Sequence, residues 1–350
     1  MKTFDEFRGV EMYYSLIKPF LFLLPPEKSH HFTLSALKIF HSIGMTQVFK
    51  KSYFPCRVMG LDFDNPIGLA AGLDKNGDYL DALAALGFGF IEIGTVTPKP
   101  QAGNELPRLF RLPQYEAIIN RMGFNNKGLD YVAARLQQTK FKGILGVNIG
   151  KNRDTSLEQA HEDYVIGFRR MAPYASYITV NISSPNTEGL RNLQQENLLK
   201  YLLQSLKREQ KIFFELSKKY VPLVIKISPD LTTKEITNMA EIMLEQKADG
   251  VIATNTTISR EGVANFQEAG GLSGKPLAKP ATEVIKKLHE VLQDKIPIIG
   301  CGGIFSGKDV EEKLMAGAKL VQIYTGLIYE GPEIVSQLVE AAAIFPHLIM

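Results

Sequence analysis

Three residues in this sequence could carry chemistry because each lies at or just after the end of a short apolar segment. They are Lys75, Ser184 and Lys226. A lysine at the end of a buried strand needs an anionic partner, since burial of an unpaired charge is costly. Either lysine alone could extend its side chain to solvent. Together they indicate a negatively charged ligand.

Ser184 lies in the stretch VNISSPNTEGLRNL, residues 180–193. Asn, Ser and Pro are ordinary turn formers, so a simple turn is one interpretation. The stretch lacks the GxSxG motif of a hydrolase, and no histidine lies nearby. A serine is a weak base and needs a site that excludes water. Ser184 therefore suits removal of an acidified C–H proton while a hydride leaves the neighbouring carbon.

Two glycine-rich segments predict a phosphate site. GCGGIFSGKD (300–309) and YTGLIYEGP (324–332) follow the last two apolar segments. Tight turns are the alternative, but backbone N–H groups in such loops commonly bind phosphate at the mouth of an α/β barrel. A phosphate site beside a ring-sized apolar mouth suggests flavin mononucleotide (FMN). A nearby lysine would stabilise negative charge on its reduced ring.

The segments that must position these residues alternate between apolar and amphipathic. Eight short runs rich in Ile, Val and Leu predict parallel strands buried on both faces, at 65–72, 87–94, 143–150, 176–183, 222–228, 248–255, 296–303 and 319–326. Amphipathic stretches predict helices at 78–86, 157–171, 196–219, 233–246, 280–292 and 307–316. No strand is followed by GxGxxG, which disfavours a dinucleotide-binding sheet. The pattern predicts an α/β protein of the (β/α)8 TIM-barrel class over residues 53–350.

Polar or glycine residues end most of the predicted strands. Three segments, 95–125, 183–195 and 255–279, are too long to be simple connections. Loops that follow barrel strands build the active site, so we expect these three at the mouth.

Residues 1–52 predict a separate N-terminal extension of two helices. Phe32, Ala36, Ile39, Phe40 and Ile43 fall on one helical stripe, and MYYSLIKPFLFLL supplies a second apolar surface. The extension could be additional core or a hairpin inserted into a membrane surface. Its apolar run, interrupted by a lysine and a proline, is about half the ~20 residues that a membrane-spanning helix needs, and it lacks the features of a secretion signal.

Composition and charge exclude further classes of binding site. The chain has 350 residues, a net charge of +3 and two cysteines. No basic patch indicates nucleic acid, and no metal-ligand pattern is present, so we expect no metal site. Two cysteines are too few for a disulfide framework and favour a reducing compartment. Cys56 and Cys301 are best interpreted as packed thiols.

The motifs together resemble dihydroorotate dehydrogenase of the membrane-associated, quinone-dependent class 2. In chain order they are PPEKSHHFTLSAL, NPIGLAAGLDKNG, GFIEIGTVTPKPQAGNELPRLFRL, NRMGFNN, GVNIGKN, NISSPNTEGLRNLQ, VIATNTT, GGLSGKPL, IIGCGGI and VQIYTG. A serine at the base position and an N-terminal extension both fit class 2, because class 1 enzymes have a cysteine there and lack the extension.

The resemblance implies oxidation of (S)-dihydroorotate to orotate in pyrimidine biosynthesis, with Ser184 as the base and one FMN per chain. It places FMN at Ala71, Gly72, Lys75, Thr95, Asn148, Asn181, Lys226, Thr254, Gly274, Gly303, Tyr324 and Thr325. It places orotate at Lys75, Asn120, Arg121, Met122, Gly123, Phe124, Asn181, Asn186, Asn255 and Thr256.

The resemblance also implies that a membrane quinone reoxidises the flavin through a tunnel at His30 and Arg111. It predicts a peripheral protein on the cytoplasmic side of the cell membrane, attached through residues 1–52, with no obligate protein partner. Two alternatives remain at this point. One is a related flavin barrel that uses fumarate or a nicotinamide cofactor as acceptor, and the other is a ligand-binding or membrane-scaffold barrel that has lost catalysis.

Overall fold

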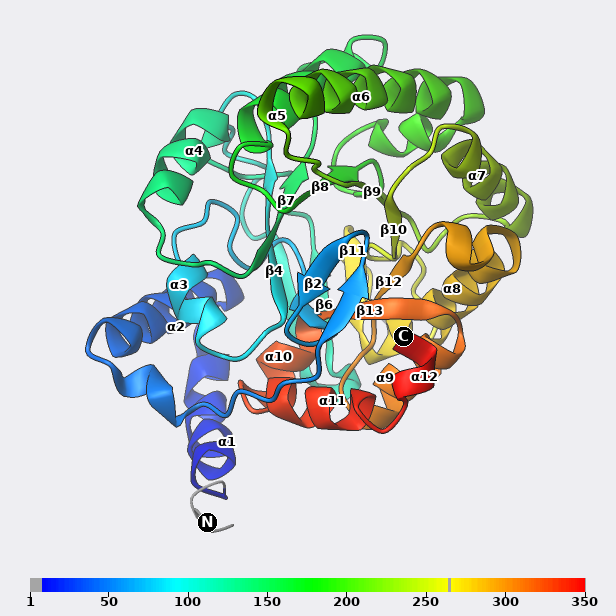
Figure 1. Ribbon diagram of the computed structural model, residues 1–350. Helices are drawn as coiled ribbons and strands as arrows, with labels where there is room; N and C mark the ends of the chain where they lie inside the picture. Colours follow the sequence, from blue (N-terminus) through cyan, green and yellow to red (C-terminus); the bar gives the residue numbers. More distant parts are fainter. Residues whose placement is uncertain (1–7, 264–265, 350) are drawn as a thin grey trace.

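A closed barrel of eight parallel strands forms the centre of the computed structural model, which describes residues 8–263 and 266–349 (Figure 1). The strands are β3 (Ile67–Leu69), β4 (Phe90–Val96), β7 (Ile144–Ile149), β8 (Tyr177–Asn181), β9 (Leu223–Ile227), β10 (Gly250–Ala253), β12 (Ile298–Cys301) and β13 (Ala318–Ile323). They pair in chain order, and β13 closes the barrel on β3. Each of the eight predicted segments contains most or all of one strand, so the predicted (β/α)8 fold is confirmed.

Large and small side chains fill the barrel interior in complementary positions. The Phe90 ring occupies the space that a Cβ at Gly68 would need, and the Tyr177 ring does the same at Gly146. Both aromatic side chains are fully buried. The glycines in these strands are therefore a packing requirement, because the interior of a small barrel is filled by side chains.

Helices surround the barrel. They are α3 (Leu80–Ala84), α4 (Gly128–Gln138), α5 (Ala160–Met171), α6 (Glu196–Ser217), α7 (Thr233–Glu245), α8 (Ala278–Leu292), α9 (Gly307–Met315), α10 (Thr325–Glu330), α11 (Ile334–Ala342) and α12 (Pro346–Ile349). Capping boxes begin α7 at Thr232 and α9 at Ser306, where each cap side chain accepts a backbone N–H of the first turn. Short 3-10 helices complete the chain at η1 (Met45–Val48), η2 (Pro113–Tyr115), η3 (Leu190–Gln194), η4 (Lys275–Leu277) and η5 (Gln293–Lys295).

A second, three-stranded sheet is built from two of the long segments. It has the antiparallel order β11 (Gly271–Gly274), β6 (Ala117–Asn120) and β5 (Leu109–Leu112). Leu272, Ile119 and Leu112 form a small apolar cluster of their own. The segments 95–125 and 255–279 therefore support each other as one structure. A hairpin of β1 (Cys56–Val58) and β2 (Leu61–Phe63) packs at the amino ends of the barrel strands, where Phe63 contacts Phe90.

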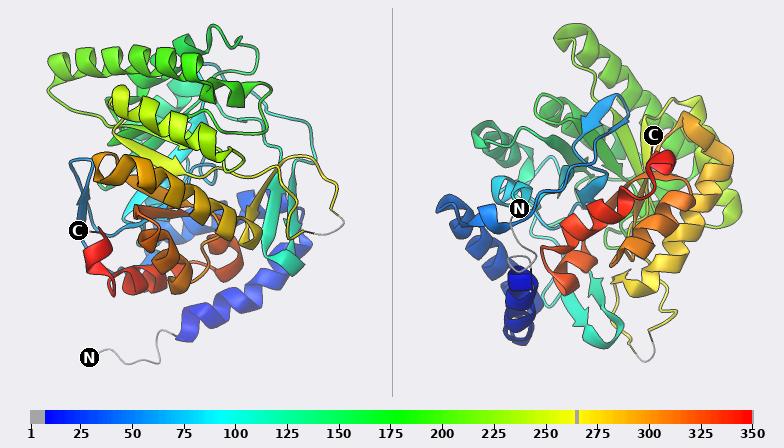
Figure 2. Two further views of the ribbon diagram at one scale, coloured as in Figure 1. Left: turned by 90° about the vertical axis from the view of Figure 1, so that its right-hand side faces the viewer. Right: turned by 60° about the horizontal axis from the view of Figure 1, so that its bottom comes forward.

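Two helices precede the barrel and lie against one side of it, as Figure 2 shows. α1 (Arg8–Leu23) is attached to α10 by hydrogen bonds from Tyr14 Oη to the Ile328 carbonyl, at 2.6 Å, and from Lys18 Nζ to the Tyr329 carbonyl, at 2.9 Å. α2 (Pro26–Ser42) contacts α3 and β5. No helix within residues 8–263 and 266–349 is long and apolar enough to cross a membrane.

The N-terminal helices expose their apolar side chains. On α2 and just after it, Phe32, Ile39, Phe40 and Ile43 of the predicted stripe are exposed, and only Ala36 is half-buried. The same side chains cannot serve as additional core, so that alternative is wrong for the stripe. The exposed apolar set, here called the N-terminal apolar surface, comprises Leu16, Ile17, Phe20, Leu23, Leu24, Phe32, Ile39, Phe40, Ile43, Met45 and Val48.

Candidate active site

One cavity lies between the carboxyl ends of the barrel strands and the three-stranded sheet. It encloses about 1090 Å³ of space, including solvent at its mouth. Nearly all of the predicted substrate residues line it, namely Lys75, Asn120, Met122, Gly123, Phe124, Asn181, Asn186, Asn255 and Thr256. Ser184 lines the same cavity. The barrel loops therefore place the candidate base beside amide groups suited to a planar polar ring.

The predicted flavin residues also converge on this cavity. Those that line it are Ala71, Gly72, Lys75, Thr95, Asn181, Lys226, Thr254, Gly274, Gly303, Tyr324 and Thr325. Asn148 is fully buried one layer below. Its Oδ1 accepts a hydrogen bond from Thr95 Oγ1 at 2.6 Å, and its amide donates to Glu92 Oε1 at 2.9 Å. It supports Thr95 in this structure and does not itself line the cavity.

Arg121 is the predicted substrate residue that the structure places elsewhere. Its guanidinium pairs with Glu268 at 2.6 Å and stacks over the Phe110 ring. Its side chain does not line the cavity. The reason is local, because successive residues of an extended segment point to opposite sides and Asn120 takes the inward position. Arg121 therefore lies outside the cavity lining in this structure, and its contact with the substrate stays a prediction.

Two lysines make the cavity electropositive. Lys75 Nζ donates to the Gly72 carbonyl at 2.7 Å, and burial lowers the pKa of Lys75 to about 8. Lys226 is buried at the cavity wall. Among the described residues, neither makes an ion pair within 4.0 Å, so each is available to an anionic ligand. Both lysines therefore lie at one cavity, and the negatively charged ligand that they indicated in the sequence stays a prediction.

A buried carboxylate supports the floor of the cavity. Glu92, on β4, accepts hydrogen bonds from Asn148, Tyr177, Thr179 and Gln322, all between 2.9 and 3.0 Å. Gln322 lines the cavity, and its Oε1 is buried without a hydrogen-bond partner among the described residues. A buried acceptor of this kind is costly unless a ligand donates to it.

Backbone packing at the glycine-rich loops fits a phosphate. A Cβ at Gly303 would lie 2.3 Å from Ala278 Cα, and one at Gly326 would lie 2.2 Å from the Ile304 carbonyl oxygen. No side chain fits at either position, so the backbone of both glycines lines the cavity directly. Ser273 and Thr325 share a hydrogen bond of 2.8 Å at the cavity wall and add hydroxyl groups. With the free acceptor of Gln322, these features fit FMN at this position.

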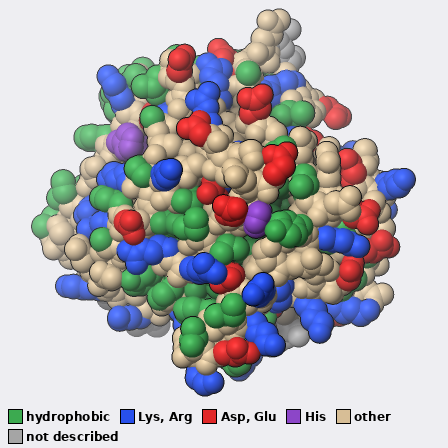
Figure 3. All heavy atoms as spheres, turned by 90° about the horizontal axis from the view of Figure 1, so that it is seen from above, with side chains coloured by type: hydrophobic (Ala, Val, Ile, Leu, Met, Phe, Trp, Pro, Cys, Tyr) green, Lys and Arg blue, Asp and Glu red, His purple; other side chains and the backbone are tan. Residues whose placement is uncertain are grey.

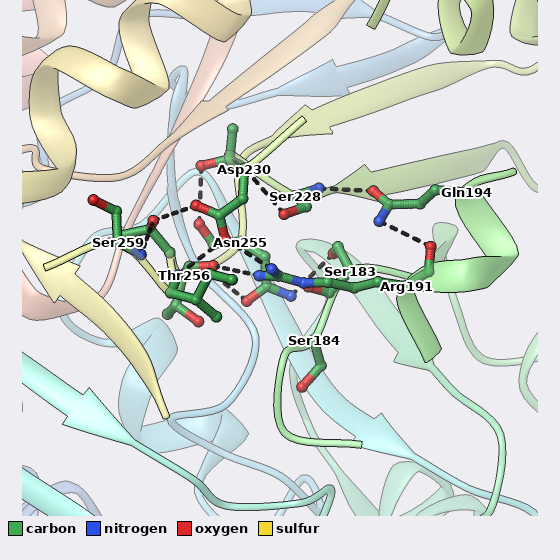
Figure 4. Close-up of polar contacts among 12 residues, drawn as sticks. Ser183, Ser184, Arg191, Gln194, Ser228, Asp230, Asn255, Thr256 and Ser259 are labelled. Atoms are coloured by element: carbon green, nitrogen blue, oxygen red, sulfur yellow. Dashed lines mark hydrogen bonds and ion pairs between the residues drawn. The ribbon is translucent and has the colours of Figure 1, made fainter. Parts of the chain in front are cut away.

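Ser184 is presented by the loop between β8 and η3. The backbone N–H of Asn186 donates to its Oγ at 3.3 Å. Figure 4 shows Arg191 on the other side of this loop, with its guanidinium directed at Ser183, Asp230 and Thr256. Cys301 also lines the cavity, and burial raises the pKa of its thiol, which agrees with a packed cysteine.

The N-terminal helices reach the cavity through a half-buried ion pair. Glu27 on α2 pairs with Arg108 at 2.7 Å, and Arg108 Nη1 also donates to the Asn104 carbonyl at 2.9 Å. The Asn104 amide in turn donates to the Asn186 carbonyl at 3.1 Å. These contacts connect α2 with the loop that carries Ser184.

The two predicted quinone residues lie outside the cavity lining, on the side of the N-terminal helices. Burial, and then the charge of Lys75, lowers the pKa of His30 to about 3, so His30 is neutral at ordinary pH. Arg111 on β5 donates to the Leu21 carbonyl at 3.1 Å and stacks over the Phe22 ring. The charge of Lys75 thus contributes to the lowered pKa of His30. Arg111, in contrast, contacts the end of α1.

Sequence reasoning missed several residues of the site. Gln322, Ser273 and Arg108 lie within predicted motifs, but nothing in their local pattern sets them apart. Arg191 was part of the motif around Ser184, and its role depends on partners from two other loops. The one signal that could have drawn attention to Arg191 is that a charged residue follows the candidate base Ser184 by seven positions within one motif.

An eight-stranded α/β barrel with a polar cavity at the carboxyl ends of its strands defines the class of (β/α)8-barrel enzymes. Comparison with known proteins identifies the group within that class. The sequence profile named Dihydroorotate dehydrogenase matches residues 54–343. The chain belongs to the dihydroorotate dehydrogenase family, which confirms the resemblance seen in the sequence.

Relatives match along nearly the whole chain. A protein named dihydroorotate dehydrogenase (quinone) from Acinetobacter baylyi is 55% identical over 334 residues, covering 94% of this chain and 99% of its own. Another of the same name from Nitrosospira multiformis is 54% identical, with 94% and 95% covered. A crystal structure of the Eimeria tenella enzyme in complex with ferulenol superposes with a TM-score of 0.82 at 37% identity, covering 91% of this chain and 90% of that one.

Proposed function

We propose that this protein oxidises (S)-dihydroorotate to orotate with bound FMN and passes the electrons to a membrane quinone. The observation that carries the proposal is the convergence of Ser184, Lys75 and the asparagines on one cavity in a member of this family. The names of its close relatives support the same reaction and acceptor. In the overall reaction the substrate loses a proton and a hydride, its C5=C6 double bond forms, and the quinone becomes a quinol.

Several residues that line the cavity would each have their own role in this reaction. Ser184 Oγ, which is buried, would accept the proton from C5 of the substrate while its own hydroxyl proton passes to solvent through a proton relay. Lys75 would bind the substrate anion, and the amides of Asn120, Asn186 and Asn255 would hold the ring in register with Ser184. Lys226 would stabilise negative charge on the neighbouring ring of the cofactor.

FMN would be held by the flavin residues described above, with its phosphate between the Gly303 and Gly326 loops. When bound, it would supply the two-electron acceptor for the C6 hydride. The support for this placement is the unpartnered acceptor of Gln322 and the backbone of Gly303 and Gly326, which lines the cavity where no side chain fits.

The N-terminal helices would bring the quinone and the membrane to the site. Phe20 and Ile43 are 70% and 62% exposed, and both belong to the N-terminal apolar surface. Exposed apolar groups of this size are typical of an interaction surface. By contrast, the face over α5 and α6 mixes acidic, basic and apolar side chains (Figure 3). We propose that α1 and α2 lie on the cytoplasmic surface of the cell membrane, and that quinone enters between them near His30 and Arg111.

Single-turnover reduction of the bound flavin tests the role of Ser184. Purified protein is mixed anaerobically with dihydroorotate, and flavin absorbance is followed. A Ser184→Ala variant is expected to reduce its flavin about 10²- to 10⁴-fold more slowly, the usual contribution of a general base. A Ser205→Ala variant on the outer helix α6 is the control and should react at the normal rate. A normal rate in Ser184→Ala would remove the base assignment.

A further inference from the structure

Arg191 connects three barrel loops that come from different strands. Its Nε donates to the Ser183 carbonyl at 3.1 Å, after β8. Its Nη1 donates to Asp230 Oδ2 at 2.7 Å, after β9, and its Nη2 donates to the Thr256 carbonyl at 3.0 Å, after β10. Figure 4 shows the guanidinium between these loops, with Ser184, which lines the cavity, on the loop after β8. One planar group thus fixes the loops on two sides of the candidate active site.

Asp230 holds the guanidinium in place. Its Oδ2 also accepts the backbone N–H of Ile258 at 2.9 Å, and its Oδ1 accepts the Thr257 hydroxyl. Its own backbone N–H donates to Ser228 Oγ at 3.1 Å. The carboxylate is therefore anchored independently of Arg191, and the charge-assisted bond between them sets the orientation of the guanidinium.

Neither Arg191 nor Asp230 lines the cavity. Arg191 acts on the peptide that directly precedes Ser184 and on the peptide of Thr256, a predicted substrate residue. A second bond spans the same two loops, because the Asn255 amide donates to Ser183 Oγ at 3.0 Å. The distance between the base and the residues that hold the substrate ring thus depends on these contacts.

We infer that Arg191, oriented by Asp230, is a positioning residue that sets Ser184 relative to Thr256 and Asn255 for proton abstraction. The inference rests on the proposed function, since it requires Ser184 to be the base. A lysine cannot replace this arginine, because one ammonium group cannot make three bonds in the fixed plane of a guanidinium. A displacement of about 1 Å in such a site can reduce the rate about 10²-fold.

Anaerobic flavin reduction by saturating dihydroorotate, in the full-length holoenzyme, tests this role. Arg191→Lys is expected to lower the limiting rate constant about 10- to 100-fold, with normal flavin content and thermal unfolding. The decisive readout is the same substitution in a Ser184→Ala background. In that background Arg191→Lys should lower the rate constant less than about threefold, because the effects of two residues that act through one another are not additive. Arg169→Lys, which alters an Arg–Glu pair between α5 and α6, is the matched control and should have no effect.

The outcomes separate the inference from the proposed function. If Ser184→Ala is slow but Arg191→Lys reacts at the normal rate, the positioning role is refuted and the base assignment survives. An equal loss in both backgrounds also refutes it, since Arg191 would then act without Ser184. If Ser184→Ala reacts normally, the base assignment fails, and the inference that rests on it is refuted as well. Should Arg191→Lys not fold, Asp230→Asn keeps the guanidinium and its carbonyl bonds, and it must show the same dependence on Ser184 at smaller magnitude.

Discussion

The pH dependence of orotate binding follows from the burial of Lys75. Burial lowers the pKa of Lys75 from 10.5 to about 8, and an anionic ligand favours the protonated form. Orotate binding therefore takes up a proton above pH 8 and weakens as pH rises. The protonated fraction falls from about 0.9 at pH 7 to about 0.1 at pH 9, so affinity should drop about tenfold over this interval.

Orotate binding can be measured from the change that it causes in the flavin spectrum of the oxidised holoenzyme. The dissociation constant should be nearly constant below pH 7.5 and rise toward a tenfold change per pH unit above pH 8. In Lys75→Met, binding should be weaker at all pH values and independent of pH over the same range. A wild-type dissociation constant that does not change between pH 7 and pH 9 would refute the assignment of Lys75 as the anion-binding group.

Three further predictions concern the extension and the cofactor. Phe20→Ser combined with Ile43→Ser should weaken binding to anionic phospholipid vesicles by about tenfold or more, measured by co-sedimentation, with activity toward a soluble short-chain quinone unchanged. Arg108→Ala, which leaves Glu27 without its half-buried partner, should loosen α2 by about 1.5 kcal/mol, seen as faster amide exchange in that helix, and should raise the KM for quinone. Gly326→Ala should lower FMN affinity by about tenfold or more, measured by equilibrium dialysis, because its Cβ would meet the Ile304 carbonyl.

Matched variants are available for the first two of these predictions, and each of the three has a result that would contradict it. Leu216→Ser removes an even more exposed apolar side chain, on α6, and should leave vesicle binding unchanged. Arg57→Ala breaks an exposed ion pair with Asp62 and should not affect α2. Normal vesicle binding, normal exchange in α2, or full FMN retention would each contradict the corresponding assignment.

The local sequence pattern was sufficient to predict the barrel and most of the residues that line the cavity. Each buried strand is a short run of β-branched and aliphatic residues, and the parallel fold brings the ends of all eight together. Lys75, Asn181 and Lys226 could therefore be assigned to one site from their positions at strand ends alone. This succeeds because in a closed parallel barrel the strand direction determines where each end lies.

Contacts between distant segments could not be predicted in the same way. The pairing of Leu272 with Ile119 joins residues far apart in the chain, and neither segment shows a marked strand pattern by itself. The direction of Arg121 depends on Glu268 and Phe110, which belong to other segments. The bridge made by Arg191 likewise requires two further loops to be in place.

The N-terminal helices illustrate a different limit. The stripe of Phe32, Ile39 and Ile43 was evident from helical spacing, but the pattern is the same whether a helix packs on a core or on a membrane. The structure excludes the stripe from the barrel core, because it shows which side of α2 contacts the barrel. Ser29 and Leu34 are buried there, while the stripe is exposed.

The most direct test of the central claim is an anaerobic absorbance titration of the purified full-length protein. Dihydroorotate is added first, then a short-chain quinone, with fumarate and NAD in parallel samples. The proposed function predicts a flavin spectrum that bleaches with dihydroorotate and returns with the quinone, but not with fumarate or NAD. A flavin that stays oxidised in the presence of dihydroorotate would contradict the assigned substrate and the role of Ser184. A reduced flavin reoxidised only by fumarate or NAD would contradict the assigned acceptor.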